Sequence, residues 1–168
     1  MTIETLFGTE EITSTPRTLR FRRLKAIYED LTMHVSDDIS DYLKPSTRYT
    51  TPSQVFETFK FLQNETREIF LCIHLNAKNM VICVDLVSQG SMSQSIVQPV
   101  EVYAPALLSK ASALIFVHNH PSQDPAPSSE DIAITRRLKE CGELLNLRVL
   151  DHIIIGETYL SFVEHGLL

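Results

Sequence analysis

The sequence predicts a mixed β-sheet flanked by helices, in the α/β or α+β class. Two observations lead to this prediction. Over residues 51–168, short apolar runs typical of strands alternate with segments of helical periodicity. Their order is helix, two strands, helix, strand, helix and two strands, which indicates one sheet with helices on its faces. With 168 residues, of which 43% are hydrophobic, the chain is long enough for one core of ordinary size.

The main domain is predicted to open with a helix over residues 52–63. Residues 51–54, Thr-Pro-Ser-Gln, have the form of a capping box with proline at the first helical position. Four apolar side chains share one face of this helix: Val55, Phe56, Phe59 and Leu62. Two strand-like runs follow, IFLCIHL at 69–75 and VICVDLV at 81–87. The polar gap between them is short, so we expect a β-hairpin.

A second helix is expected over residues 99–110. Pro105 lies inside it and predicts a kink or a broken first turn. The run ALIFV at 113–117 is apolar without alternation, which is typical of a central strand covered on both faces. This strand leads directly into two histidines, His118 and His120.

A third helix is predicted over residues 129–146. Its periodicity predicts a buried face with four members: Ile134, Leu138, Cys141 and Leu145. Two more strands follow at 148–155 and 158–163, joined by a turn at Gly156-Glu157. They complete the predicted sheet.

Residues 1–50 are polar and irregular, and we interpret them as an N-terminal extension of a metal-binding domain at 51–168. One amphipathic helix is a candidate around residues 19–31. Residues 16–25, PRTLRFRRLK, carry five basic side chains and no acid. A solvated helix face or a mobile arm explains them, and a contact with nucleic acid or an acidic partner is the alternative. The formal net charge of −6 argues against a surface that is basic throughout.

Cysteine usage and the absence of long apolar runs predict a cytoplasmic protein. Cys72, Cys83 and Cys141 are odd in number and widely spaced, which is typical of free thiols in a reducing compartment. No apolar run is long enough to span a bilayer, and the first residues show no signal-peptide pattern, so we expect no membrane partner. Because no Cys-x-x-Cys pair is present, any metal here must be held by nitrogen and oxygen.

The most chemically specific segment is His118-x-His120-Pro121, followed by Ser128-x-x-Asp131. Histidines one residue apart put both imidazoles on the same side of a strand end, and a carboxylate in the first turn of the next helix can face back toward them. Two imidazoles and a carboxylate, with room for water, are the usual ligands of hydrolytic zinc sites. The alternative is that Ser128 and Asp131 only cap the helix.

These residues resemble the JAMM motif of MPN-domain metalloproteases, and the run HNHPSQDPAPSSEDIAITRRLKECGELLNLRVLDHIIIG is similar to the RadC branch of that family. LNAKNMVI, VSQGSMSQSIVQPVEVYAPAL and YLSFVEHGLL extend the resemblance over residues 51–168. It implies the MPN/JAB architecture, which is cytidine-deaminase-like. RadC proteins usually carry an N-terminal helix-hairpin-helix region, for which residues 1–50 are too short. The chain therefore resembles a short, MPN-only member, as found among mobile-element copies.

The resemblance implies a Zn²⁺ ion held by His118, His120 and Asp131, with water in the fourth position. Ser128 would hydrogen-bond to that water or steady the oxyanion. RadC loops usually read HNHPSGD, whereas this chain has Gln123 in place of the glycine, so the backbone of the loop is expected to be less free.

The resemblance also implies a general base just before an early strand, and Glu68 occupies that place. The alternative is that Glu68 is only an exposed carboxylate at the edge of the strand, without a catalytic role. Glu65 and Glu101 are further candidates for the base. The expected reaction is hydrolysis of a peptide or isopeptide bond in a protein or peptide substrate.

Other polar residues have open roles. His152 is expected to be structural or to support a ligand, with direct ligation as the alternative. Asp124 and Asp151 are candidates for fixing the tautomer of a ligand histidine, and His74 is expected in the core. A function of a different class is also open, because RadC is named for a proposed role in DNA repair. The chain would then be an accessory module that binds DNA, a DNA-repair or mobile-element partner, or another protein, with a metal site but little catalysis.

Overall fold

The computed structural model describes residues 2–5, 8–11, 47–90 and 97–168. Five strands form one sheet in the order β4-β3-β5-β6-β7. Their bounds are β3 Ile69–Leu75, β4 Val81–Gln89, β5 Ala113–Asn119, β6 Arg148–Ile155 and β7 Tyr159–Ser161. A separate antiparallel hairpin consists of β1 (Thr2–Thr5) and β2 (Gly8–Glu11), in a segment predicted to be irregular. The helix candidate at 19–31 and the basic stretch at 16–25 lie outside the described residues.

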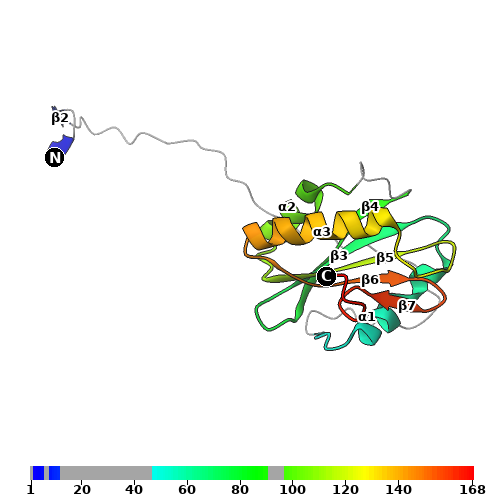
Figure 1. Cartoon of the computed structure of the whole chain (residues 1–168). Coiled ribbons are helices and arrows are strands. Elements are labelled where there is room, and N and C mark those ends of the chain that lie inside the picture. The colour runs from blue at the N-terminus through cyan, green and yellow to red at the C-terminus, as the bar shows by residue number, and fades with distance from the viewer. Residues whose placement is uncertain (1, 6–7, 12–46, 91–96) are drawn as a thin grey trace.

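The sheet is mixed, as predicted. β3 pairs antiparallel with both β4 and β5, so the predicted hairpin is confirmed. β5 runs parallel to β6, and β7 returns antiparallel to β6. Helices α2 (Pro99–Leu108) and α3 (Ser129–Leu144) cover one face, while α1 (Pro52–Phe59) and the 3₁₀ helix η1 (Lys60–Asn64) cover the other (Figure 1). The domain is therefore a three-layer α+β structure.

Alternation along the strands separates two hydrophobic cores. In β3, Phe70 and Cys72 pack beneath α2 and α3, whereas Leu71 and Ile73 pack against the α1 layer. All seven residues of β5 are buried, which confirms the predicted central strand. The strand runs on to Asn119, so His118 belongs to it.

β6 contains one extra residue relative to β5. Leu114 pairs with Val149, but Ile115 pairs with Asp151, so Leu150 has no partner of its own across the pair. A bulge of this kind reverses the in-out alternation beyond it. His152 consequently lies on the α2/α3 side with Phe116, while Asp151 lies on the α1 side.

The helices depart from the predicted details at their ends. The predicted helix over 52–63 is present, but its last part is η1, and the Thr51 side chain makes no capping hydrogen bond. Instead, Oε1 of Gln54 accepts from the backbone N–H of Thr50 at 2.8 Å. α2 continues across Pro105 without a break. α3 ends at Leu144, so Leu145 is 41% exposed and was wrongly assigned to its buried face.

Within the described part of the chain, no helix combines the length and apolar character needed to cross a bilayer.

Candidate metal centre

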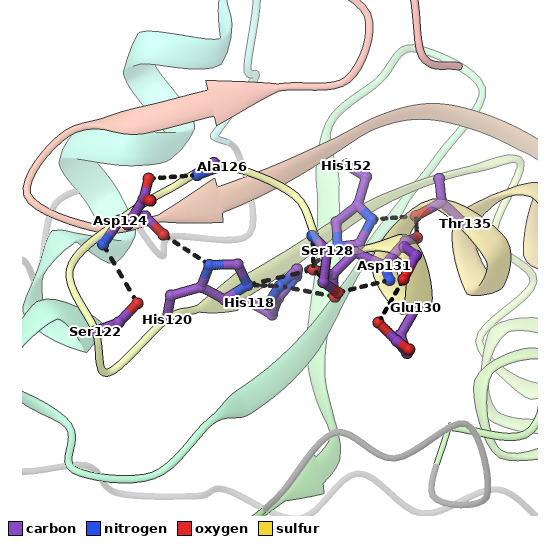
Figure 2. A network of polar contacts seen from close by, with 11 residues as sticks. His118, His120, Ser122, Asp124, Ala126, Ser128, Glu130, Asp131, Thr135 and His152 are labelled. Carbon is purple, nitrogen blue, oxygen red and sulfur yellow. Dashed lines mark hydrogen bonds and ion pairs between the residues drawn. The ribbon is translucent and has the colours of Figure 1, made fainter.

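Three elements bring His118, His120 and Asp131 together. His118 is fully buried near the end of β5, where its side chain faces the α2/α3 layer. His120 follows the end of the strand, and its backbone N–H donates to the carbonyl of Ile155 in β6 at 2.8 Å. Asp131 lies in the first turn of α3 and points back to both imidazoles (Figure 2). The juxtaposition predicted from the sequence is therefore present.

The distances among the three side chains fit one small cation. Nε2 of His118 lies 3.0 Å from Nε2 of His120 and 3.3 Å from Oδ1 of Asp131. Nε2 of His120 lies 3.4 Å from Oδ2 of the same carboxylate. Four-coordinate zinc with bonds of about 2.05 Å holds neighbouring ligand atoms about 3.3 Å apart. One ligand atom from each residue can be chosen so that all lie within 4.8 Å of one another.

Asp131 caps its helix and faces the histidines at the same time. The backbone N–H of Ser128 donates to Oδ2 at 2.8 Å and the Ser128 hydroxyl donates to it at 2.6 Å, which completes a capping box. Oδ1 is the oxygen nearer His118. Capping and metal ligation by Asp131 are therefore compatible, because Oδ1 faces His118 and takes no part in the capping box, while Oδ2 accepts from Ser128 and also faces His120.

Burial keeps two of the histidines neutral. It lowers the pKa of His118 to about 4, against the attraction of Asp131. It also lowers the pKa of His152 well below the usual value. His152 is enclosed by aromatic rings, with the ring centroid of Phe162 4.8 Å away. A neutral imidazole has one donor and one acceptor nitrogen, so the positions of the protons matter.

A chain of hydrogen bonds fixes the tautomer of His118. The Thr135 hydroxyl donates to the backbone carbonyl of Asp131 at 2.6 Å, which leaves the hydroxyl oxygen as an acceptor. Nδ1 of His152 lies 2.6 Å from that oxygen and therefore carries the proton. Nε2 of His152 then accepts from Nδ1 of His118 at 2.8 Å. His118 consequently turns the lone pair of Nε2 toward the other two ligands (Figure 2).

His120 is oriented in the same sense. Its Nδ1 lies 2.7 Å from the backbone carbonyl oxygen of Asp124, which can only accept, so Nδ1 carries the proton. When both rings are neutral, two Nε2 lone pairs face each other at 3.0 Å. Such an arrangement is repulsive unless a proton or a metal cation lies between the ligands. The donor set therefore fits a bound metal ion.

The pKa values of His120 and Asp131 are both shifted by their contacts within this cluster. The hydrogen bond to Asp131 raises the pKa of His120, although burial opposes the shift. Burial alone would raise the pKa of Asp131, but hydrogen bonding to His120, the charge of His118 and hydrogen bonds from Ser128 lower it well below the usual value. The carboxylate is thus ionised across the physiological range, as a metal ligand must be.

Glu68 immediately precedes β3 and is half-buried. Its charge contributes to the raised pKa of His120, which places its carboxylate within electrostatic reach of that ring. Within the described residues, neither Glu65 nor Glu101 contributes in this way to any of the three candidate ligands. Glu68 therefore remains the leading candidate for the base.

Other predicted residues lie in different surroundings. Asp151 is on the opposite face of the sheet, where it accepts from the Ser161 hydroxyl at 2.6 Å, so its predicted support of a ligand is wrong. Asp124 does orient His120, but through its backbone carbonyl rather than its carboxylate. His74 is buried as expected. Thr135 was missed, although its place one helical turn after Asp131 was readable from the sequence.

The loop between the ligands is held against the β6–β7 turn. Gln123 has a φ of 67°, a left-handed backbone conformation that favours glycine. Its side-chain amide donates to the carbonyl of Gln63 at 2.7 Å, and its own carbonyl accepts from Glu157 N–H at 2.7 Å. A Cβ on Gly156 would lie 2.3 Å from that carbonyl oxygen. The close packing fixes the loop that carries His120.

Fold and site together define an α+β domain with a candidate metal centre of two histidines and one aspartate, where a buried strand meets the start of a helix. The family model described as "RadC-like JAB domain" matches residues 49–167. The chain belongs to the RadC-like JAB domain family, which confirms the resemblance seen in the sequence.

Relatives named "UPF0758 protein" share much of the sequence. The one from Trichlorobacter lovleyi is 55% identical over 128 residues, which are 75% of this chain and 56% of that protein. The one from Pelobacter propionicus is 57% identical over 123 residues, 72% of this chain and 54% of that protein. The chain therefore spans about half the length of these curated relatives. Their name states no activity.

Proposed function

We propose that this chain is a zinc-dependent hydrolase that cleaves peptide or isopeptide bonds. The observation that carries the proposal is the pair of facing Nε2 lone pairs on His118 and His120, next to the ionised Asp131. This donor set matches the nitrogen and oxygen ligands of catalytic zinc sites with three protein ligands. The identity of the metal as zinc is part of the proposal.

A bound zinc ion would polarise the substrate carbonyl and lower the pKa of water from 15.7 toward about 7. In this mechanism Glu68 accepts a proton from the attacking water on its carboxylate and returns it to the leaving amine nitrogen. The charge of Glu68 contributes to the raised pKa of His120, which supports this role. The Ser128 hydroxyl donates to Oδ2 of Asp131 at 2.6 Å, which would orient that carboxylate, and its hydrogen bond to the water or the oxyanion stays part of the proposal.

The proposed substrate is a protein or peptide, and the proposed compartment is the cytoplasm. The three cysteines are free, which supports a reducing environment. The DNA-associated alternative depended on residues 16–25, which lie outside the described residues, so no structural observation favours it.

Metal analysis tests the ligand set. The purified protein is expected to hold about one zinc per chain, and His118→Ala is expected to abolish tight binding. Asp124→Ala is the matched control, because its carboxylate bonds only locally to Ala126 N–H and its backbone carbonyl is retained. A folded wild-type chain that binds no zinc would overturn the assignment.

Cleavage of a panel of peptides and isopeptide-linked proteins tests the reaction. Glu68→Gln is expected to retain zinc and lose amide hydrolysis, while Glu65→Gln keeps both. Turnover that survives Glu68→Gln would remove Glu68 from the mechanism. A zinc-loaded wild-type chain that cleaves no member of the panel would count against the hydrolase itself.

A further inference from the structure

Asn119 lies between the two histidines in sequence, but its side chain forms hydrogen bonds with the segment that leads into β3. Its backbone belongs to β5 and pairs with Ile155 of β6. The side chain is fully buried and crosses to the segment that enters β3. Oδ1 accepts from the backbone N–H of Ile69 at 2.7 Å, and Nδ2 donates to the carbonyl of Arg67 at 3.1 Å.

These two hydrogen bonds grip the peptide groups on either side of Glu68. The carbonyl of Arg67 belongs to the peptide before Glu68, and the N–H of Ile69 belongs to the peptide after it. The carbonyl of Glu68 itself accepts from Gly90 N–H at 2.8 Å. The backbone of this one residue is therefore held from both sides, although it lies outside any regular strand.

The side chain of Asn119 provides hydrogen bonds to the backbone just beyond the last β3–β5 pair. The β3–β5 ladder runs up to the pair Phe70 and His118, and the two hydrogen bonds of the Asn119 side chain lie just beyond that pair. A primary amide offers one acceptor and one donor in a plane, which matches the N–H and C=O that an adjacent strand would supply. Glu68 is thereby tied to the strand that carries His118.

We propose that Asn119 is a positioning residue that holds the carboxylate of Glu68 at the metal centre. This inference rests on the proposed hydrolase function and deepens it. It explains why a buried amide lies between the histidines without pointing at the metal ligands. A displacement of about 1 Å in a reacting group can lower a rate by about 100-fold, so a loosened Glu68 has a large expected effect.

The test compares Asn119→Ala with Glu68→Gln and with the double variant, all loaded with zinc. Asn119→Ala is expected to lower kcat by about 100-fold, with KM and zinc content close to wild type. In the Glu68→Gln background the same change is expected to have little further effect, because both act through one carboxylate. Asn64→Ala removes an exposed amide and serves as the control. Losses that multiply in the double variant would overturn the inference.

A second measurement decides the question without turnover. The visible spectrum of the Co²⁺-substituted protein reports ionisation at the metal site, and Glu68→Gln is expected to shift its pH midpoint. Asn119→Ala is expected to shift the midpoint in the same direction, and amide exchange at Ile69 to become faster. A midpoint and exchange rate equal to wild type would refute the positioning role, even if the wild-type chain cleaved nothing.

Should Asn119→Ala fail to fold, Asn119→Asp replaces it. This variant keeps the shape and the acceptor for Ile69 but loses the donor to Arg67. It is expected to show the same shift of the Co²⁺ midpoint, reduced in size. A folded Asn119→Asp protein with a wild-type midpoint and wild-type kcat would overturn the inference.

Discussion

Replacing His152 by phenylalanine isolates the hydrogen-bond chain behind the metal ligands. The new ring would fit among the aromatic side chains that already enclose His152, at centroid distances of 4.8–5.8 Å. It would remove the acceptor for Nδ1–H of His118, a bond of 2.8 Å inside the protein. Thr135 would keep its bond to the carbonyl of Asp131. The change therefore leaves one buried donor, Nδ1–H of His118, without an acceptor.

The cost of that unpaired donor depends on whether metal is bound. A buried donor without a partner costs about 1–3 kcal/mol. In the metal-free protein, His118 can move its proton to Nε2 and donate toward Asp131, 3.3 Å away. When zinc occupies Nε2, the proton of His118 cannot move there and must stay on Nδ1. The penalty then falls on the metal-bound state, so we expect zinc affinity to decrease about 10–100-fold.

Competition with a chelating dye measures the zinc affinity, and urea unfolding of the metal-free protein provides the second value. We expect the His152→Phe protein to bind zinc more weakly while its metal-free stability changes little. His152→Gln offers both an acceptor and a donor, so it is expected to recover part of the affinity. Zinc binding by His152→Phe within twofold of wild type would refute the tautomer argument.

Three further outcomes are expected. Gly156→Ala places a Cβ 2.3 Å from the Gln123 carbonyl oxygen, so it should destabilise the protein by about 1–3 kcal/mol in urea unfolding and weaken zinc binding; an unchanged stability would contradict the close packing. Burial lowers the pKa of His74 to about 4 from 6.5, so protonation favours the unfolded chain and stability falls as pH decreases from 6.5 toward 4. His74→Leu should remove about 3 kcal/mol of this loss, measured by unfolding at both pH values, and an equally steep loss in the variant would exclude His74 as its source. Tyr103→Phe removes the bond to the Leu138 carbonyl and should cost about 1 kcal/mol in thermal unfolding, so an equal melting temperature would assign that bond no net value.

The sheet and its helices were predictable because their signals are local. IFLCIHL and ALIFV have the length and apolar character of buried strands, and both form strands with every residue buried. The residue at which α3 ends was harder to predict from the sequence. Leu145 fits the helical period, but the helix ends at Leu144, and the next residue to be buried is Leu147. Periodicity alone does not specify where a helix stops.

The candidate ligands were also within reach, because a motif of short spacing carries them. Their supporting contacts were not. His118 and His152 are 34 residues apart, and Asn119 and Ile69 are 50 apart, so these pairs depend on strand order. Asp131 shows a further limit, since one carboxylate both caps the helix and faces the histidines. A sequence pattern presents these as alternatives, whereas in the structure Oδ2 joins the capping box and Oδ1 is left to face His118.

Leu150, the extra residue of β6, determines which side chain of this strand lies next to His118. With strict alternation, the side chain behind His118 would be the Asp151 carboxylate rather than the His152 imidazole. A carboxylate there would place a negative charge behind the ligand set, in place of a neutral ring. Two chains with the same His-x-His motif and the same residue types in this strand can therefore hold their metal ligands in different electrostatic surroundings, if they differ by one residue in length.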